Sequence, residues 1–253
     1  MKLFDLTGRL ALVTGSSKGI GLAIARGLLE AGATVILNGR DAEQLERARA
    51  TLAAWDGKVY ARSFDVTDSR AVETAIAAIE AEIGPIEVLF NNAGMQHRAP
   101  LEEFPLEAWE RLKATNIDSV FFVGQAVAKR MIPRGRGKII NIASVQSELA
   151  RSGIAPYTAT KGAVKMLTKG MATDWARHGL QVNALGPGYF KTELNAALVA
   201  DPTFNEWLKQ RTPAGRWADV DELMGAAIFL ASDASSFVNG HILYVDGGIT
   251  SCL

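Results

Sequence analysis

Residues 10–21 read Leu-Ala-Leu-Val-Thr-Gly-Ser-Ser-Lys-Gly-Ile-Gly, and this stretch carries the strongest fold signal in the chain. An apolar run suited to a buried strand ends at Thr14, and an apolar helical pattern follows from Leu22 to Leu29. Glycines between them let the turn close tightly and let its backbone approach a pyrophosphate, whose charge a helix start stabilises. The spacing is GxxxGxG, which differs from both the GxGxxG fingerprint and the P-loop. It predicts a phosphate-binding turn formed by Gly15, Ser17, Lys18, Gly19, Ile20 and Gly21.

On both sides of this turn, short β-branched runs alternate with longer amphipathic stretches along nearly the whole chain. This alternation is typical of βα units that build a parallel sheet with helices on both faces. It predicts an α/β fold, a doubly wound parallel sheet of the Rossmann type. The expected strands are 10–14, 34–38, 58–63, 86–90, 137–142, 180–185 and 242–245, and the expected helices are 19–31, 41–54, 68–83, 106–131, 156–177 and 219–231.

The chain has no Pro/Ser-rich linker, charge block or low-complexity tract, so we expect a single domain over residues 1–253. The stretch 186–218 interrupts the alternation, with three prolines and no convincing strand. An insertion at the carboxyl edge of a parallel sheet is well placed to cover a ligand crevice. We therefore expect 186–218 to be a small substrate lid.

Composition excludes several classes of function. The 27 basic and 27 acidic residues give a formal net charge of zero, which argues against a nucleic-acid-binding surface. Cys252 is the single cysteine and the three histidines show no metal-ligand spacing, so we expect no disulfide and no metal site. No segment has the length of apolar sequence that spans a bilayer. We expect a cytoplasmic protein without membrane contact.

Cofactor choice is expected to depend on the end of the second strand, where an acidic residue would bind the 2′-hydroxyl of NAD. The sequence here is Asn38-Gly39-Arg40, and the first carboxylate is Asp41, at the start of the next helix. Arg40 can form a bidentate contact with a phosphate, and Lys18 can reach the same side. The pattern predicts NADP(H).

Tyr157 and Lys161 are four residues apart, which places a phenol and an ammonium on one face of a helix that begins near Pro156. A tyrosine with an ordinary pKa near 10 is a poor base at neutral pH, but a nearby cation favours its phenolate. The pair is therefore a candidate acid/base centre.

These motifs, with others in the same order along the chain, resemble those of the short-chain dehydrogenase/reductase family. The resemblance extends from the first strand to Asp246-Gly247-Gly248. The residues that carry it are Thr14 to Gly21, Asp65-Val66, Asn91-Asn92-Ala93-Gly94, Asn116, Ser144, Tyr157 with Lys161, and Pro187-Gly188.

The resemblance implies a role for each of these residues. Tyr157 would exchange the proton, Ser144 would hydrogen-bond the reacting oxygen, and Lys161 would also bind the nicotinamide ribose. Asn116 would hold a water that links Lys161 to solvent. The remaining cofactor contacts would come from Asp65 and Val66 at the adenine, Asn92, Ala93 and Gly94 at the sugar, and Pro187, Gly188 and Thr192 at the nicotinamide.

The substrate is indicated by two polar segments that have no cofactor role, residues 95–98 and 145–151. Their amides and carboxylate can bind hydroxyl groups, and their arginines can pair with a carboxylate. A small hydroxylated keto acid suits this lining better than an apolar substrate. The candidate substrate residues are Arg98, Gln146, Glu148 and Arg151, with Ser144 and Tyr157 at the reacting carbon.

The same segments, with 133–138, 184–190, 211–217 and 234–248, resemble the gluconate 5-dehydrogenase branch of the family. That resemblance implies a reversible NADP-linked interconversion of D-gluconate and 5-keto-D-gluconate. It also implies a homotetramer, with a dimer as the alternative.

Two other functions stay open. A 3-oxoacyl carrier-protein reductase would share this scaffold, and Arg130, Arg134, Arg136 and Lys138 would supply the basic patch for an acidic carrier protein. A catalytically silent NADP-binding sensor or scaffold would share the fold, which never proves activity. The complete set of Asn116, Ser144, Tyr157 and Lys161 argues against the silent protein.

Overall fold

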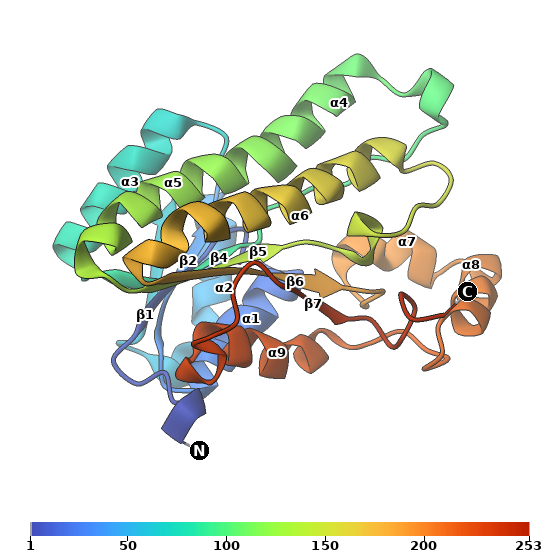
Figure 1. Ribbon diagram of the computed structural model, residues 1–253. Helices are drawn as coiled ribbons and strands as arrows, with labels where there is room; N and C mark the ends of the chain where they lie inside the picture. The colour runs from blue at the N-terminus through green and yellow to red at the C-terminus, as the bar shows by residue number, and fades with distance from the viewer. Residues whose placement is uncertain (1, 253) are drawn as a thin grey trace.

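The computed structural model describes residues 2–252, so the predicted domain ends, 1 and 253, lie outside the described residues. Its centre is one seven-stranded parallel sheet with the strand order β3-β2-β1-β4-β5-β6-β7 (Figure 1). This arrangement confirms the predicted doubly wound parallel sheet. The strands are β1 (Leu10–Val13), β2 (Thr34–Gly39), β3 (Val59–Ser63), β4 (Ile86–Asn91), β5 (Gly137–Ile142), β6 (Leu180–Pro187) and β7 (Ile242–Val245).

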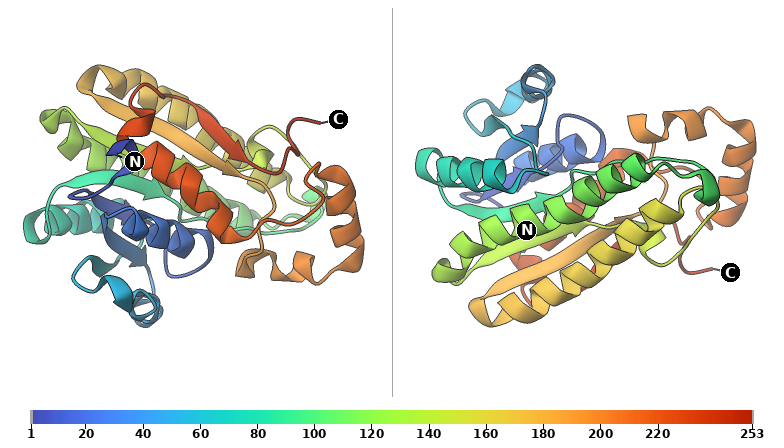
Figure 2. Two further views of the ribbon diagram at one scale, coloured as in Figure 1. Left: turned by 90° about the horizontal axis from the view of Figure 1, so that it is seen from below. Right: turned by 90° about the horizontal axis from the view of Figure 1, so that it is seen from above.

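Helices cover both faces of the sheet, as the views from below and above show (Figure 2). One face carries α1, α2 and α9, and the other carries α3, α5 and α6 (Figure 1). The helices are α1 (Gly19–Glu30), α2 (Ala42–Ala50), α3 (Ser69–Glu82), α4 (Leu106–Lys113), α5 (Ser119–Met131), α6 (Ala155–Trp175), α7 (Ala196–Val199), α8 (Pro202–Arg211) and α9 (Met224–Ala231).

Apolar side chains fill the space between the sheet and each helical layer. All four residues of β1 are buried, which is expected for a central parallel strand covered on both faces. On α1, Ile24 and Leu28 face the sheet one turn apart, and on α3 Ile76 and Ile79 do the same on the opposite side. Burial of these stripes is the main stabilisation of the layered fold.

The sheet contains a switch point at β1, because the chain moves from β3 at one edge across to β4 on the other side of β1. Val13 is in register with Leu37 of β2 and with Phe90 of β4. The loops that leave β1 and β4 therefore turn to opposite faces of the sheet and leave a crevice at the carboxyl ends of the strands, where ligands bind in such folds.

Three predicted helices differ from the structure. The stretch 106–131 is divided by a π-helical turn over Ala114–Asp118, which separates α4 from α5. The predicted helix 219–231 begins with a 3₁₀ turn, Val220–Leu223, before α9. The predicted helix 41–54 ends at Ala50, because a separate 3₁₀ turn follows at Ala53–Trp55.

The predicted lid is mostly helical and is closed at its base. Strand β6 continues to Pro187, two residues into the stretch predicted to hold no strand, and α7 and α8 follow. Phe190 and Ala218 form a short parallel bridge that joins the two ends of the insertion. Phe190 and Leu208 of this insertion are buried. The insertion predicted to be a lid therefore lies on a closed stem beyond the carboxyl ends of the strands (Figure 1).

Candidate active site

The glycine turn between β1 and α1 has the backbone that phosphate binding requires. Gly15 and Gly19 have φ values of 61° and 56°, in the left-handed region that favours glycine. A Cβ on Gly15 would lie 2.8 Å from Ala93 Cα, whereas a Cβ on Gly19 would meet nothing within 4 Å. No side chain caps α1 at Lys18, so within the described residues no side chain occupies the N–H groups that start the helix. These groups can receive an anion.

A network of hydrogen bonds joins this turn to the end of β4. The Thr14 hydroxyl accepts hydrogen bonds from the backbone N–H groups of Asn92 and Ala93, each at 3.0 Å. The Asn92 amide donates to the carbonyls of Thr14 and Gly15, each at 2.9 Å. These bonds hold the two walls of the crevice together. This role of Thr14 was not predicted from the sequence, although its position at the end of the first strand is the signal for it.

At the end of β2, Arg40 is the group available to a ligand. The Asp41 carboxylate accepts from Gln44 N at 2.9 Å and caps α2, so it is committed to the helix. Arg40 is exposed, lines the cavity and forms no ion pair within residues 2–252. Burial would raise the pKa of Asp65, but hydrogen bonds from Thr67 and the nearby Arg40 charge keep it below its usual value.

The candidate catalytic side chains come from β5 and α6. Ser144 follows β5, and its hydroxyl accepts from Gln146 N at 3.1 Å. Tyr157 and Lys161 lie one turn apart on α6, with the Lys161 ammonium 5.7 Å from the centre of the Tyr157 ring. Lys161 Nζ donates to the Ile142 carbonyl at 2.7 Å, which joins α6 to β5. The structure therefore brings Ser144, Tyr157 and Lys161 to one cavity.

Burial dominates the protonation of these groups. It raises the pKa of the Tyr157 phenol, while a hydrogen bond with Ser144 acts in the opposite direction. Burial also lowers the pKa of the Lys161 ammonium to about 8. The Tyr157 phenol is therefore neutral at pH 7 in the cofactor-free protein.

Asn116 lies behind this group, within the π-helical turn between α4 and α5, and is 1% exposed. Its Oδ1 accepts from Met95 N at 2.8 Å, and its Nδ2 donates to the Met95 carbonyl at 3.0 Å and to Thr160 Oγ1 at 3.1 Å. The side chain thus joins the loop after β4 to α6. The water that it is expected to hold stays a prediction.

Most of the predicted substrate residues line the same cavity, which has a volume of about 780 Å³. Gln96 and Gln146 each have a buried side-chain Oε1 without a hydrogen-bond partner in the part of the chain that the structure describes. Such acceptors are costly to bury unless a ligand donates to them. They suit the hydroxyl groups of a sugar acid.

Arg98 and Arg151 reach the cavity from two different loops, and neither forms an ion pair within residues 2–252. Partial burial, and then the neighbouring Arg151 charge, lower the pKa of Arg98. Two guanidinium groups that approach one another without an acidic partner favour an anionic ligand between them.

Glu148 is the one predicted substrate residue that lies outside this cavity. Its Oε1 accepts from the Tyr244 hydroxyl at 3.0 Å and from the Lys165 ammonium. These contacts join the loop after β5 to α6 and β7, and Glu148 does not line the cavity. The expected substrate contact from Glu148 is therefore corrected, because its carboxylate is already paired.

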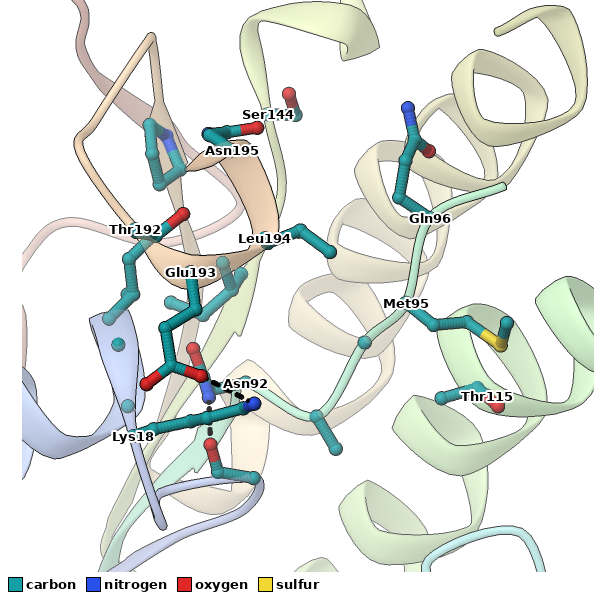
Figure 3. A pocket seen from close by; sticks show the side chains of 18 of the residues that line it. Lys18, Asn92, Met95, Gln96, Thr115, Ser144, Thr192, Glu193, Leu194 and Asn195 are labelled. Carbon is teal, nitrogen blue, oxygen red and sulfur yellow. Dashed lines mark hydrogen bonds and ion pairs between the residues drawn. The ribbon is translucent and has the colours of Figure 1, made fainter. Parts of the chain in front are cut away.

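Residues of the insertion after β6 also line the cavity, and some of them were not predicted from the sequence. Tyr189 and Asn195 line the cavity, together with the predicted Thr192. Figure 3 shows Glu193 of the lid beside Lys18 of the glycine turn, and Lys18 Nζ lies 2.6 Å from Glu193 Oε2. An aromatic residue directly after Pro187-Gly188 is the signal that would have identified Tyr189.

The expected basic patch is neutralised. Each of its three arginines pairs with a glutamate, and Lys138 is 4% exposed. The pairs are Arg130–Glu73, Arg134–Glu80 and Arg136–Glu87. The surface therefore offers little net positive charge to an acidic carrier protein.

Two further features of residues 2–252 bear on function. No group of three or more potential ligands is arranged to hold a metal ion in this part of the chain. Between residues 2 and 252, no helix is both long enough and apolar enough to cross a membrane.

Known proteins resemble the chain over its whole length. A family model described as Enoyl-(Acyl carrier protein) reductase matches residues 15–250. The chain is 64% identical over 251 residues to the gluconate 5-dehydrogenase of Gluconobacter oxydans (strain 621H), covering 99% of this chain and 98% of that protein. It is 52% identical over 247 residues to the 5-keto-D-gluconate 5-reductase of Escherichia coli (strain K12), covering 98% and 97%.

A solved structure shows the same similarity in three dimensions. It is a gluconate 5-dehydrogenase from Burkholderia cenocepacia J2315, crystallised in complex with NADP and tartrate. The two chains are 58% identical, with a TM-score of 0.96, and the match covers 100% of this chain and 99% of that one.

Proposed function

Because the chain belongs to the short-chain dehydrogenase/reductase family, we propose that it is an NADP(H)-dependent oxidoreductase that interconverts D-gluconate and 5-keto-D-gluconate. One observation carries the proposal. The Ser144, Tyr157 and Lys161 group faces the same cavity as the unpaired Arg98 and Arg151. The cavity therefore combines a proton-transfer group with a place for a carboxylate, and the two relatives named for this reaction support the assignment.

The residues at the glycine turn fit NADP(H). The uncapped start of α1 and the open space at Gly19 suit the pyrophosphate. Arg40, free of any acidic partner within the described residues, suits the 2′-phosphate. The other cofactor contacts that we propose are Gly15, Ser17, Lys18, Ile20, Gly21, Asp65, Val66, Asn92, Ala93, Gly94, Pro187, Gly188 and Thr192, which all line the cavity. When bound, NADPH supplies the hydride.

The protein's part in the reaction is to orient the substrate and to move a proton. In reduction, the neutral Tyr157 phenol donates its proton to the oxygen of the 5-keto group, and Ser144 hydrogen-bonds the same oxygen. In oxidation, the Tyr157 phenolate accepts the hydroxyl proton, and the nearby Lys161 ammonium favours that phenolate. Asn116 holds Met95 and Thr160 in place behind them.

The rest of the cavity binds the substrate by its other polar groups. The carboxylate lies between Arg98 and Arg151, and the chain hydroxyls donate to the unpartnered oxygens of Gln96 and Gln146. An apolar acyl chain would leave these oxygens unpaired. This lining favours a sugar acid over a carrier-bound acyl group.

An initial-rate assay tests the proposal by following NADPH oxidation with 5-keto-D-gluconate, with NADH and an acetoacetyl thioester in parallel. We expect rapid turnover of the keto acid and a strong preference for NADPH. Activity with the thioester alone would replace the proposal with a 3-oxoacyl carrier-protein reductase, which the neutralised basic patch argues against. Tight NADPH binding without turnover of either compound would indicate a sensor or scaffold.

We also propose that the active form is a homotetramer in the cytoplasm. Leu106, Phe121 and Met166 of the α4, α5 and α6 layer are 81%, 42% and 61% exposed, which is more apolar exposure than one helical face normally shows. Symmetric pairing of this face would bury them. The cytoplasm is supported by the cysteine content, because a chain with a single cysteine forms no internal disulfide bond and needs no oxidising compartment. A sizing column with light scattering tests the assembly, and a stable active monomer would contradict it.

A further inference from the structure

Phe204, on the lid helix α8, lies against the guanidinium group of Arg151. Arg151 Cζ is 5.3 Å from the centre of the Phe204 ring. The two residues are far apart in the chain, and the contact forms because α8 folds back toward the loop that precedes α6. A guanidinium over an aromatic face is attracted by the negative charge of the ring surface.

Arg151 has few other contacts to hold it. Its Nε is buried without a hydrogen-bond partner within residues 2–252, and its only direct backbone acceptor in that range is the Ser152 carbonyl, at 3.4 Å. It forms no ion pair there. Burial raises the pKa of the Tyr189 phenol, and the nearby Arg151 charge acts in the opposite direction. Arg151 is therefore oriented by aromatic side chains rather than by a carboxylate.

The lid holds Phe204 itself in place. Its backbone N–H donates to Asp201 Oδ1 at 3.2 Å, at the capped start of α8. Its ring lies 5.7 Å from that of Tyr189 and 6.1 Å from that of Trp217. Trp217 is 6% exposed and belongs to the end of the lid. The ring is thus a rigid support, not a mobile surface side chain.

We propose that Phe204 is a positioning residue that holds Arg151 for the carboxylate of the substrate, so that the lid helix α8 sets the selectivity for acids. This inference rests on the proposed function for the identity of the acid. Arg98 reaches the same space from the loop after β4, and its side chain is held by the weaker contact to Asn195 Oδ1 at 3.4 Å. Both arginines therefore contact the insertion 186–218, Arg151 through the Phe204 ring on α8 and Arg98 through Asn195.

Replacing Phe204 by Leu keeps the apolar packing and removes the ring. We expect the KM for 5-keto-D-gluconate to rise about 3- to 30-fold, the range that a cation–π contact supplies, while kcat and the KM for NADPH stay within about twofold. Phe204→Tyr, which keeps the ring, should restore the KM. Phe237→Leu is the matched control, because it also removes a phenyl ring and Phe237 is fully exposed, outside the aromatic cluster around Phe204.

A double-mutant cycle separates positioning from general support of the fold. In an Arg151→Met background, Phe204→Leu should cause no further rise in KM, because the group that it positions is gone. An equal rise in both backgrounds, or equal effects of the Leu and Tyr variants, would overturn the inference. Thermal unfolding of each variant shows that it is folded.

Tartrate provides a readout that does not depend on turnover. Calorimetry on the NADP⁺-saturated protein should show the tartrate Kd raised by Phe204→Leu and unchanged by Phe237→Leu. If wild type fails to reduce 5-keto-D-gluconate but this pattern holds, the proposed substrate is wrong and the role of Phe204 stands. If turnover is normal and tartrate binding is insensitive to Phe204, the positioning role is wrong and the proposed function stands.

Discussion

Lys18 of the glycine turn and Glu193 of the lid form an ion pair across the mouth of the cavity, with Nζ and Oε2 2.6 Å apart (Figure 3). Both side chains are more than half exposed, at 53% and 68%, so the pair contributes at most about 1 kcal/mol to stability. The pair matters because Glu193 and the 2′-phosphate of NADP would compete for the Lys18 ammonium. Lys18 is also the cation expected to help Arg40 bind the 2′-phosphate of NADP, and a carboxylate of the protein already neutralises it.

Glu193→Gln should therefore tighten NADPH binding. Removing the competing carboxylate frees Lys18, and we expect the Kd for NADPH to fall about two- to fivefold, the equivalent of an exposed ion pair. Fluorescence titration measures the Kd, and the gain should shrink at high salt. In a Lys18→Met background, Glu193→Gln should have no effect. An unchanged Kd in the single variant would show that the pair does not compete with the cofactor.

Tyr157→Phe should remove turnover and leave cofactor binding intact. The ring keeps its packing while the proton donor is lost, so kcat should fall about 10²- to 10⁴-fold. The Kd for NADPH should change less than about twofold. Steady-state rates and the same titration measure both quantities. Turnover at the wild-type rate would exclude Tyr157 as the acid/base group.

The pH dependence should differ between the two directions. Oxidation needs the Tyr157 phenolate and reduction needs the neutral phenol, and burial raises the pKa of Tyr157. Since the neutral form dominates at pH 7, kcat/KM for gluconate oxidation should rise about tenfold per pH unit below that pKa, while reduction stays flat.

Lys161→Met should move the oxidation profile to higher pH, because the ammonium that favours the phenolate is gone. Lys165→Met, one turn further along α6, is the control, since Lys165 pairs with Glu148 rather than facing the phenol. A profile that shifts equally in both variants would point to a general effect of charge on the helix.

Arg40→Ala should weaken NADPH binding and spare NADH. Loss of a charged hydrogen bond to a phosphate is worth about 1.5 to 3 kcal/mol, so the KM for NADPH should rise about 10- to 100-fold at unchanged kcat. The KM for NADH should stay within about twofold, because that cofactor has no 2′-phosphate. Equal losses with both cofactors would indicate that Arg40 supports the loop instead.

Lys138 on β5 should make stability depend on pH outside the active site. Burial, and then the nearby Arg9 charge, lower its pKa from 10.5 to about 8. Between these values the unfolded chain binds the proton and the folded protein does not, so stability rises with pH across this window. Relative to Lys138→Met, the free energy of unfolding of wild type should rise by about 1 to 3 kcal/mol from pH 8 to 10.5. Urea unfolding of both proteins measures the difference, and parallel pH curves would contradict it.

The strands and the motifs at their ends could be predicted well because these features are local. Hydrophobic runs identify the strands, and right-handed crossovers leave few ways to arrange them. Gly15, Asn92 and Ser144 lie within two residues of the ends of β1, β4 and β5, and Pro187 ends β6, so the register of the sheet alone brings them to one edge. Hydrophobic periodicity did not predict the break in the helix 106–131, because the helix changes its hydrogen bonding at the π-helical turn 114–118 without a change in the apolar pattern.

Side-chain partners between distant segments could not be predicted in this way. Glu148 looked like a substrate residue, yet it turns to Lys165 and Tyr244. Phe204 carried no signal at all, because its relation to Arg151 arises only when the tertiary fold brings α8 against the loop that precedes α6. A residue beside a strand end is placed by the backbone. The direction of a long side chain depends on which charges and rings packing brings within reach, and those partners lie tens of residues away in the chain.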